Sequence, residues 1–382
     1  MSTPPQRSGS GTFSDFDRFA MQRALALAAR GLETTDPNPR VGCVIVHDGL
    51  TVGEGWHEWA GEAHAEIVAL RLAGSRAAGA TAYVTLEPCS HHGRTPPCVD
   101  ALIESRVARV VFAVQDPNPR VSGRGAEQLR AAGIVVDSGL MQREAVELNA
   151  GFFTRMRHGR PWVRLKLAMS LDGRTALANG QSQWLTGEAA REDVQHWRAR
   201  SAALLTGIGT VLADDPRLTV RLPAERARPP LRVVLDSELR IPPAARLFAS
   251  HGAVWVFSAS RDEARRASLE ARGAHLEHLE VEGGSPGAAR GLPLRAVLAR
   301  LAQEEINEVQ VEAGATLAGA LLRERLVDEM LLYVAPLVLG PQARPLLVLP
   351  ELTQLAASPQ FELLESRSIG ADLRLRLRPR AT

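Results

Sequence analysis

The sequence predicts an α/β protein with two domains of unequal size. Its 382 residues suit two domains, and 45% hydrophobic with 23% charged residues is ordinary for a chain that buries a real core. Short apolar runs of strand length alternate with helical segments, and the alternation restarts after the polar, basic stretch TRMRHGRP at 154–161. We therefore expect a flexible N-terminus at 1–14, a first domain at 15–158 and a second at 159–382.

The first half reads as a sheet layered with helices on both faces. Ser14 or Asp15 can cap a first helix, and Gly31 lies where a helix usually stops. After it we predict two strands around an Asp-Gly turn within 41–56, helices at 64–74, 98–106 and 125–133, and strands at 80–86, 109–116 and 134–139. The sequence DPNPRV occurs at both 36–41 and 116–121. Because Asp-Pro and Asn-Pro favour turns, we interpret this repeat as two similar turns rather than as a duplication.

The second half repeats the alternation. Strands are predicted at 162–170, 202–209, 231–237, 253–260, 309–314 and 329–339, and helices at 188–200, 262–273, 294–305 and 316–326. A hairpin is predicted at 361–380, and Ala- and Arg-rich loops at 222–230 and 282–292. The apolar C-terminal strands permit a homo-oligomer, a dimer or a tetramer.

Charge and composition exclude several classes of partner. The formal net charge is +2, with 45 basic and 43 acidic residues interspersed, and aromatic residues are 4%, so no nucleic acid partner is expected. Residues 1–12 lack the apolar core of a signal peptide, and the apolar run at 330–340 is shorter than the roughly 20 residues that span a bilayer. A cytoplasmic enzyme or binding protein without a membrane partner is the expectation, in which three cysteines indicate metal binding or catalysis rather than disulfides.

Two short motifs predict a zinc site. HAE at 64–66 precedes PCSHHGRTPPC at 88–98, and zinc deaminases carry H-x-E followed by P-C-x-x-C. His64, Cys89 and Cys98 would bind Zn²⁺ and leave a fourth position for water, whose pKa the metal lowers towards about 7. Glu66 beside that water can take its proton and return it to a departing amine.

Other interpretations of these motifs stay open. Eight residues separate the two cysteines instead of two, so a Pro-rich surface loop is one alternative. A deaminase of nucleic-acid bases is a second, although charge and composition count against it. A structural zinc in an interaction protein is a third, with His91 or His92 as the fourth ligand. Cys43 lies in an apolar strand and is expected in the core.

Longer matches add a family resemblance. PNPRVGCVIV (37–46), GEAHAE (61–66), TLEPCSHHGRTPPC (85–98) and QDPNP (115–119) resemble the deaminase half of the bifunctional riboflavin biosynthesis deaminase–reductases, in which the eight-residue spacing is expected. The resemblance implies a cytidine-deaminase-like α/β/α fold and removal of the 2-amino group of a pyrimidine ribotide, 2,5-diamino-6-ribosylamino-4(3H)-pyrimidinone 5′-phosphate. It implies substrate contacts from Asn38, His57, His91 and Arg94.

Residues beyond 160 are less informative by themselves. VQVEAGATLAGALL (309–322) predicts a strand, a glycine turn and a helix whose first amides can hold an anion. It lacks G-x-G-x-x-G and the P-loop lysine, so a purely structural turn remains an alternative. Solvated loops equally explain Lys166, Asp172, Asp214 and Asp215 near predicted strand ends.

The resemblance extends over this half. KLAMSLDGRTA (166–176), SQWLTG (182–187), TVLADDPRLTVR (210–221) and LDS (235–237) are similar to the reductase half of the same family, which implies a dihydrofolate-reductase-like α/β domain that uses NADPH to reduce the ribosyl group to ribityl. It implies substrate contacts from Ser182, Arg198, Leu218, Arg221 and Glu312, and cofactor contacts from Ala168, Trp184, Thr210, Asp214, Ser237, Gly314, Ala315, Thr316, Leu317, Ala318, Gly319 and Ala320. From its charge and position, Lys166 is the candidate to polarise the ribose oxygen.

Overall fold

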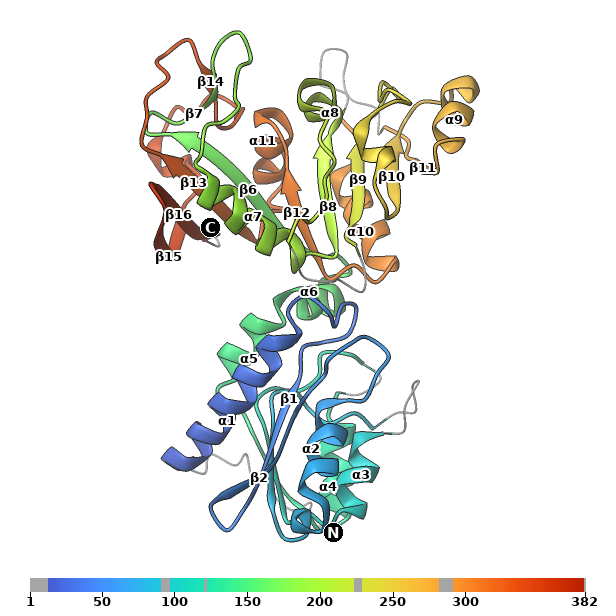
Figure 1. The fold of residues 1–382 in the computed structure, drawn as a ribbon, viewed down its shortest axis with the longest axis vertical. Helices are drawn as coiled ribbons and strands as arrows, with labels where there is room; N and C mark the ends of the chain where they lie inside the picture. Colours follow the sequence, from blue (N-terminus) through green and yellow to red (C-terminus); the bar gives the residue numbers. More distant parts are fainter. Residues whose placement is uncertain (1–12, 91–96, 120–121, 223–228, 282–290, 381–382) are drawn as a thin grey trace. The chain divides into compact units, whose positions relative to one another are not determined.

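The computed structural model describes residues 13–90, 97–119, 122–222, 229–281 and 291–380. Contacts divide the chain into two compact units, Met1–His158 and Gly159–Thr382. Both are mixed α/β units with helices packed on sheets, so the predicted fold class is confirmed (Figure 1). Within the described residues, no helix combines the length and apolar character needed to cross a bilayer.

The first unit contains a five-stranded sheet in the order β2-β1-β3-β4-β5. Its strands are β1 (Gly42–His47), β2 (Leu50–Trp56), β3 (Thr81–Val84), β4 (Arg109–Phe112) and β5 (Val135–Ser138). β1 pairs antiparallel with β2 and β3, whereas β3, β4 and β5 run parallel. Parallel neighbours need crossover connections, so the helices between them lie against the sheet.

Helices cover both faces of this sheet because alternate side chains of each strand point to opposite sides. Cys43 and Ile45 pack in one core with α2 (Ala65–Ala73), α3 (Cys98–Glu104) and α4 (Arg124–Ala131). Val44 and Val46 pack in the other with α1 (Asp15–Ala28), α5 (Gln142–Leu148) and α6 (Ala150–His158). Neither α5 nor α6 was predicted from the sequence. α6 continues into the basic stretch expected to form the domain boundary, because its buried Phe152 and Phe153 anchor it.

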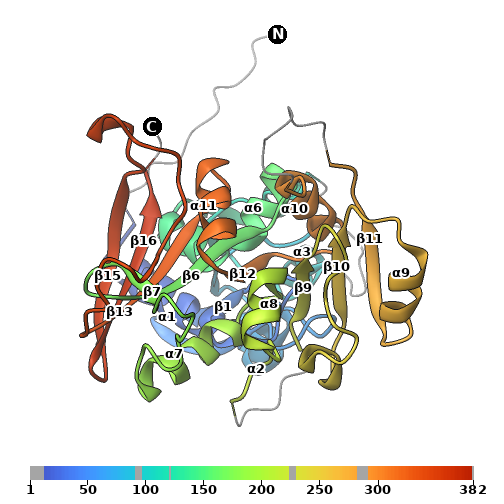
Figure 2. The ribbon, with the colours of Figure 1, turned by 90° about the horizontal axis from the view of Figure 1, so that it is seen from above.

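The second unit contains a nine-stranded sheet in the order β11-β10-β9-β8-β12-β6-β13-β16-β15. Its strands are β6 (Trp162–Ser170), β8 (Ala203–Gly207), β9 (Leu231–Leu235), β10 (Val254–Ser258), β11 (Ala274–His278), β12 (Glu308–Glu312), β13 (Glu329–Ala335), β15 (Phe361–Ile369) and β16 (Asp372–Pro379). Strands from β11 to β13 run parallel, and β16 and β15 add an antiparallel hairpin. Figure 2 shows the sheet running from β15 at one edge to β11 at the other. A separate ladder joins β7 (Arg174–Ala176) and β14 (Arg344–Pro345).

Helices lie on both faces of this sheet as well. α10 (Leu294–Gln303) and α11 (Ala315–Arg323) share the larger core. α7 (Glu188–Ala199), α8 (Ile208–Asp214) and α9 (Glu263–Glu270) contribute to the two smaller cores. Four 3₁₀ turns complete the described helices: Ala29–Gly31, Gly74–Ala77, Arg246–Ala249 and Leu355–Ala357.

Some predicted boundaries in this unit were wrong. The strand expected at 202–209 ends at Gly207, where α8 begins, and the one expected at 329–339 ends at Ala335. β7 and β11 were not predicted. β7 has only three residues, and most side chains of β11 are partly or fully exposed, so neither strand gives a clear apolar pattern. All parallel central strands were found, since strands buried on both faces read as continuous apolar runs.

Candidate functional site

Three metal-ligand side chains meet in the first unit. His64 is the N-cap of α2, Cys89 follows β3, and Cys98 is the first residue of α3. His64 Nδ1 lies 3.1 Å from Cys98 Sγ and 3.5 Å from Cys89 Sγ, and the three ligand atoms lie within 4.8 Å of one another. Two helix starts and one strand end therefore bring residues from two distant motifs to one point.

The chemistry of this donor set fits zinc. One imidazole nitrogen and two sulfurs are ligands that Zn²⁺ prefers, and three protein ligands leave a fourth tetrahedral position open. The backbone N–H of Cys98 donates to Cys89 Sγ at 3.3 Å. Hydrogen bonds with Cys98 and His64 lower the pKa of the Cys89 thiol, whereas the bond to Cys89 together with burial raises the pKa of Cys98. Zinc binds cysteines as thiolates, so a bound zinc ion would displace the thiol protons of this pair.

Glu66 lies beside these ligands. It is the second residue of α2, only 3% exposed, and the Cys98 thiol donates a hydrogen bond to its carboxylate. Burial raises the pKa of Glu66, so the carboxyl group keeps a proton more readily than an exposed one. A carboxyl that exchanges protons next to an open ligand position can serve as general base and then general acid.

Asn38 and His57 form a second layer against His64. Asn38 Nδ2 lies 3.0 Å from His57 Nε2, and His57 Nδ1 lies 3.1 Å from the carbonyl oxygen of Ala63. Because a carbonyl only accepts, Nδ1 carries the proton and Nε2 accepts from Asn38. Burial lowers the pKa of His57, which keeps this neutral form, and its ring meets the His64 ring edge-on at 5.4 Å. Asn38 Oδ1 therefore remains as an acceptor.

The other two substrate residues predicted for this site, His91 and Arg94, lie outside the described residues, as does His92. Cys43, which was expected in the core, is buried in β1 and forms no part of the ligand group.

Glu87 is a buried carboxylate for which the sequence predicted no role. It accepts hydrogen bonds from the backbone N–H groups of Asp116 (3.3 Å), Gly123 (3.0 Å) and Ala126 (3.2 Å). A Cβ added to Gly125 would lie 2.1 Å from the carbonyl oxygen of Pro88. The start of α4 is thus fastened to the segment that carries Cys89. In the sequence, Glu87 was marked only by its place after an apolar strand and within the family segment TLEPCSHHGRTPPC.

Charged side chains also converge in the second unit. Strand register pairs Glu312 at the end of β12 with Lys166 on β6. Arg198 of α7 holds Glu312 with two hydrogen bonds, Nε–Oε1 at 2.6 Å and Nη2–Oε2 at 2.7 Å. Burial opposes the charge on Glu312, but Arg198 and Lys166 outweigh it and lower its pKa to about 2. Burial lowers the pKa of Lys166, so this amine gives up a proton more readily than an exposed lysine.

The substrate residues predicted around this pair are arranged by Arg198. Its Nη1 donates to the Thr219 carbonyl at 2.9 Å, which ties the 218–221 segment to Glu312. Leu218 is buried with φ of +49°, and Gln195 accepts from the Arg221 N–H at 3.1 Å. Burial and the charge of Arg198 lower the pKa of Arg221, so the cations here exceed the acids and suit an anion.

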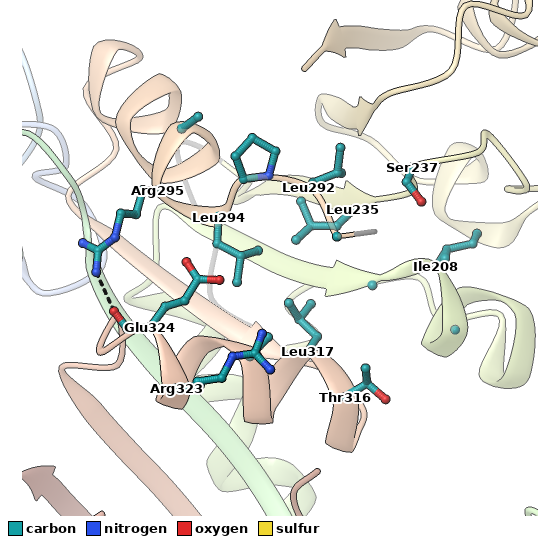
Figure 3. Close-up of a pocket in the computed structure, with 16 residues that line it drawn as sticks. Ile208, Leu235, Ser237, Leu292, Leu294, Arg295, Thr316, Leu317, Arg323 and Glu324 are labelled. Carbon is teal, nitrogen blue, oxygen red and sulfur yellow. Dashed lines mark hydrogen bonds between the residues drawn. The ribbon is translucent and has the colours of Figure 1, made fainter. Parts of the chain in front are cut away.

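The predicted cofactor residues divide into groups. Ser237, Thr316, Leu317 and Ala320 line one cavity of about 810 Å³ (Figure 3). Ala168, Thr210 and Asp214 do not line it, and lie on β6 and α8. Trp184 lies in the loop before α7 near Ser182, 68% exposed, with the Arg191 guanidinium 4.6 Å from its ring centre. Gly314 is the N-cap of α11, and Ala315 to Ala320 form its first turns.

Comparisons with known proteins agree with these two sites. The family model of the cytidine and deoxycytidylate deaminase zinc-binding region matches residues 14–114, and that of the RibD C-terminal domain matches residues 161–375. The riboflavin biosynthesis protein RibD of Escherichia coli K12 is 52% identical over 372 residues, covering 94% of this chain and 99% of that protein. The RibD of Haemophilus influenzae is 48% identical, covering 96% and 99%.

Solved structures are similar over both units. Acinetobacter baumannii RibD, form 1, has a TM-score of 0.88 at 47% identity and covers 96% of this chain and 99% of its own. A diaminohydroxyphosphoribosylaminopyrimidine deaminase/5-amino-6-(5-phosphoribosylamino)uracil reductase from Thermotoga maritima has a TM-score of 0.81 at 33% identity, with the same coverage of 96% and 99%.

Proposed function

The chain belongs to the RibD family of riboflavin biosynthesis proteins, and from that membership we propose how its two sites divide the chemistry. It is a bifunctional enzyme, a pyrimidine deaminase and an NADPH-dependent reductase. We assign deamination to residues 15–158 and reduction to 159–382, with 1–14 as an N-terminal extension. The division of contacts at His158 and Gly159 supports this assignment.

In the first site, His64, Cys89 and Cys98 hold zinc, which when bound supplies a water molecule of lowered pKa. Glu66 takes a proton from the water that attacks C2 of the pyrimidine and returns it to the amino group, which leaves as ammonia. The acceptor Oδ1 of Asn38, oriented by His57, receives a hydrogen bond from the base edge. His91 and Arg94 complete the proposed contacts, with Arg94 on the substrate phosphate.

In the second site, NADPH supplies a hydride to C1′ of the ribosyl group. The Lys166 ammonium polarises the ribose oxygen and gives it a proton as the C1′–O bond breaks, which yields the ribityl chain. Arg221 binds the substrate phosphate, while Arg198 holds Glu312 and the 218–221 segment in place. Ser182 and Leu218 complete the substrate contacts, and Trp184 covers the reacting rings.

The observation that carries this proposal is the meeting of three zinc ligands with a buried glutamate. The test uses zinc-loaded protein and the diaminopyrimidine ribotide. Ammonia release is followed first without nicotinamide cofactor, and NADPH is then added and its oxidation recorded. We expect ammonia first and NADPH oxidation second. Folded, zinc-loaded protein that gives neither signal would overturn the proposal.

Two variants separate the halves. Glu66→Gln should retain zinc and reduce the deaminated substrate normally, while ammonia release falls roughly 10²- to 10⁴-fold, the contribution of a general acid–base. Lys166→Met should do the reverse, with normal ammonia release and little NADPH oxidation. Normal reduction by Lys166→Met would remove Lys166 from the mechanism.

The two alternative readings of the zinc motif are not favoured. A structural zinc usually has four protein ligands, and the group within the described residues has three beside a buried carboxyl. A deaminase of nucleic-acid bases would leave the second unit unexplained, whereas a reductase-family model matches residues 161–375.

Location and assembly are separate parts of the proposal. A cytoplasmic location is supported by three free cysteines, two of them zinc ligands, which a reducing compartment preserves. A homo-oligomer, dimer or tetramer, is supported by β15, an edge strand that exposes 56% of Leu363. Light scattering of wild type and Leu363→Glu measures the assembly, and a monomeric wild type would rule it out.

A further inference from the structure

A cavity opens in the second unit where β8 and β9 end. Its volume of about 810 Å³ suits a ligand the size of a mononucleotide or larger. Its lining comes from the ends of these two strands, from the start of α10 and from one side of α11 (Figure 3). Ligands of α/β sheets bind at the carboxyl ends of parallel strands, which is where this cavity lies.

The walls of the cavity are apolar enough for a flat ring. Ile208, Leu235, Leu292, Leu294 and Leu317 line it, and all but Leu317 are at most 8% exposed in the second unit's cores. An adenine ring packs on such side chains through its faces, while its edge reaches polar groups such as Ser237 or Thr316 at the rim.

Two arginines line the same cavity. Arg295, in the first turn of α10, donates from Nη2 to the carbonyl oxygen of Glu324 at 2.6 Å. Within the described residues Arg323, the last residue of α11, makes no hydrogen bond or ion pair. Figure 3 shows its side chain extending from α11 towards the space beside Leu317.

We propose that this cavity holds the adenosine end of NADPH and that Arg323, assisted by Arg295, binds its 2′-phosphate. The inference rests on the proposed reductase function and goes beyond it by naming the residues that select NADPH over NADH. An arginine fork matches phosphate oxygens bidentately, and a 2′-phosphate is the group that distinguishes the two cofactors.

Helix geometry supports this placement. Thr316, Ala320 and Arg323 lie on one side of α11, at the i, i+4 and i+7 positions. The amides at the start of α11 can hold the pyrophosphate. Arg323 lies about 10 Å further along the helix axis, at roughly 1.5 Å per residue, a span that the ribose and the length of the arginine side chain can bridge.

Glu324 is the one acidic residue among those that line the cavity. A carboxylate at this position would favour the ribose 2′-hydroxyl of NADH, as in many NAD-binding sites. Here two arginines face one glutamate, so the local charge favours a phosphate dianion. The balance of charges therefore predicts that the cavity binds NADPH more tightly than NADH, although the Glu324 carboxylate partly opposes this preference.

The experiment measures dissociation constants of NADPH, NADH and 2′,5′-ADP by calorimetry on the full-length, zinc-loaded protein. Arg323→Ala should weaken NADPH and 2′,5′-ADP roughly 10- to 100-fold, the effect of losing one charge-assisted pair, and leave NADH unchanged. Arg295→Ala should have a smaller effect, since part of its guanidinium is already engaged. Arg325→Ala is the matched control, because it removes the same charge two residues away and does not line the cavity.

The outcomes separate this inference from the proposed function. Wild type that binds no NADPH would overturn the reductase assignment itself. Wild type that prefers NADPH, with an Arg323→Ala variant that keeps that preference, would overturn only the role of Arg323. NADH binding, which should be unchanged in every variant, checks that the second unit is folded, and partial recovery in Arg323→Lys would support a charge effect.

Discussion

Replacing Glu87 tests how strongly the start of α4 is fastened to the zinc-binding segment. Its carboxylate accepts three backbone N–H groups, and two of these bonds are buried. Each buried N–H left without an acceptor costs roughly 1–3 kcal/mol, and water can reach the part-buried Gly123 amide. Glu87→Ala should therefore lower the free energy of unfolding by roughly 2–6 kcal/mol.

Glu87→Gln refines this expectation. Oε2 accepts from Asp116 and Gly123, and Oε1 accepts from Ala126. A glutamine oxygen in the Oε2 position keeps the first two bonds, while its amino group faces the Ala126 N–H. We therefore expect the Gln variant to lose about 1–3 kcal/mol, clearly less than the Ala variant.

In the assay, zinc release reports on unfolding by urea, and ammonia production is measured in the same samples. NADPH oxidation with the deaminated substrate is the internal control, because Glu87 belongs to the other unit. Glu104→Ala is the matched variant, since Glu104 is an exposed glutamate at the end of α3. Unchanged zinc retention in Glu87→Ala, or equal losses in both activities, would refute the reasoning.

Three further predictions concern the glycine contact, the metal and the buried ion pair. Gly125→Ala should weaken zinc binding and leave NADPH oxidation intact, because its Cβ would lie 2.1 Å from the Pro88 oxygen; equal activity with wild type would contradict this. Zinc removal by a chelator should stop ammonia release but not reduction, and added Zn²⁺ should restore it. The pKa of Glu312 is lowered from 4.5 to about 2, so the ionised carboxylate stabilises the fold by about 3 kcal/mol. This stabilisation is present above pH 4.5 and is lost as the pH falls towards 2. The difference in urea midpoint between wild type and Glu312→Gln should therefore shrink over that range and stay constant above it.

The sequence by itself indicated the α/β class, the central strands and the residues of the zinc motif. These features depend on residue type and short spacing. Parallel strands buried on both faces are continuous apolar runs, and HAE followed by two cysteines is typical of a zinc deaminase. α5 and α6 were missed because a basic helix end looks like a linker when the buried Phe152 and Phe153 are not known to be anchors.

Only the tertiary structure decided which distant side chains meet. The substrate contact of Arg198 stays a prediction, whereas its pairing with Glu312 was visible only in the structure, where β12 pairs with β6 and α7 packs nearby. Glu87 appeared only as part of a longer family segment, and Arg323 lay in no motif. The structure shows Glu87 bound to three backbone amides, and Arg323 beside a cavity with no hydrogen bond or ion pair among the described residues. Ion pairs and backbone contacts between segments far apart depend on strand order and register, which local patterns of residues do not encode.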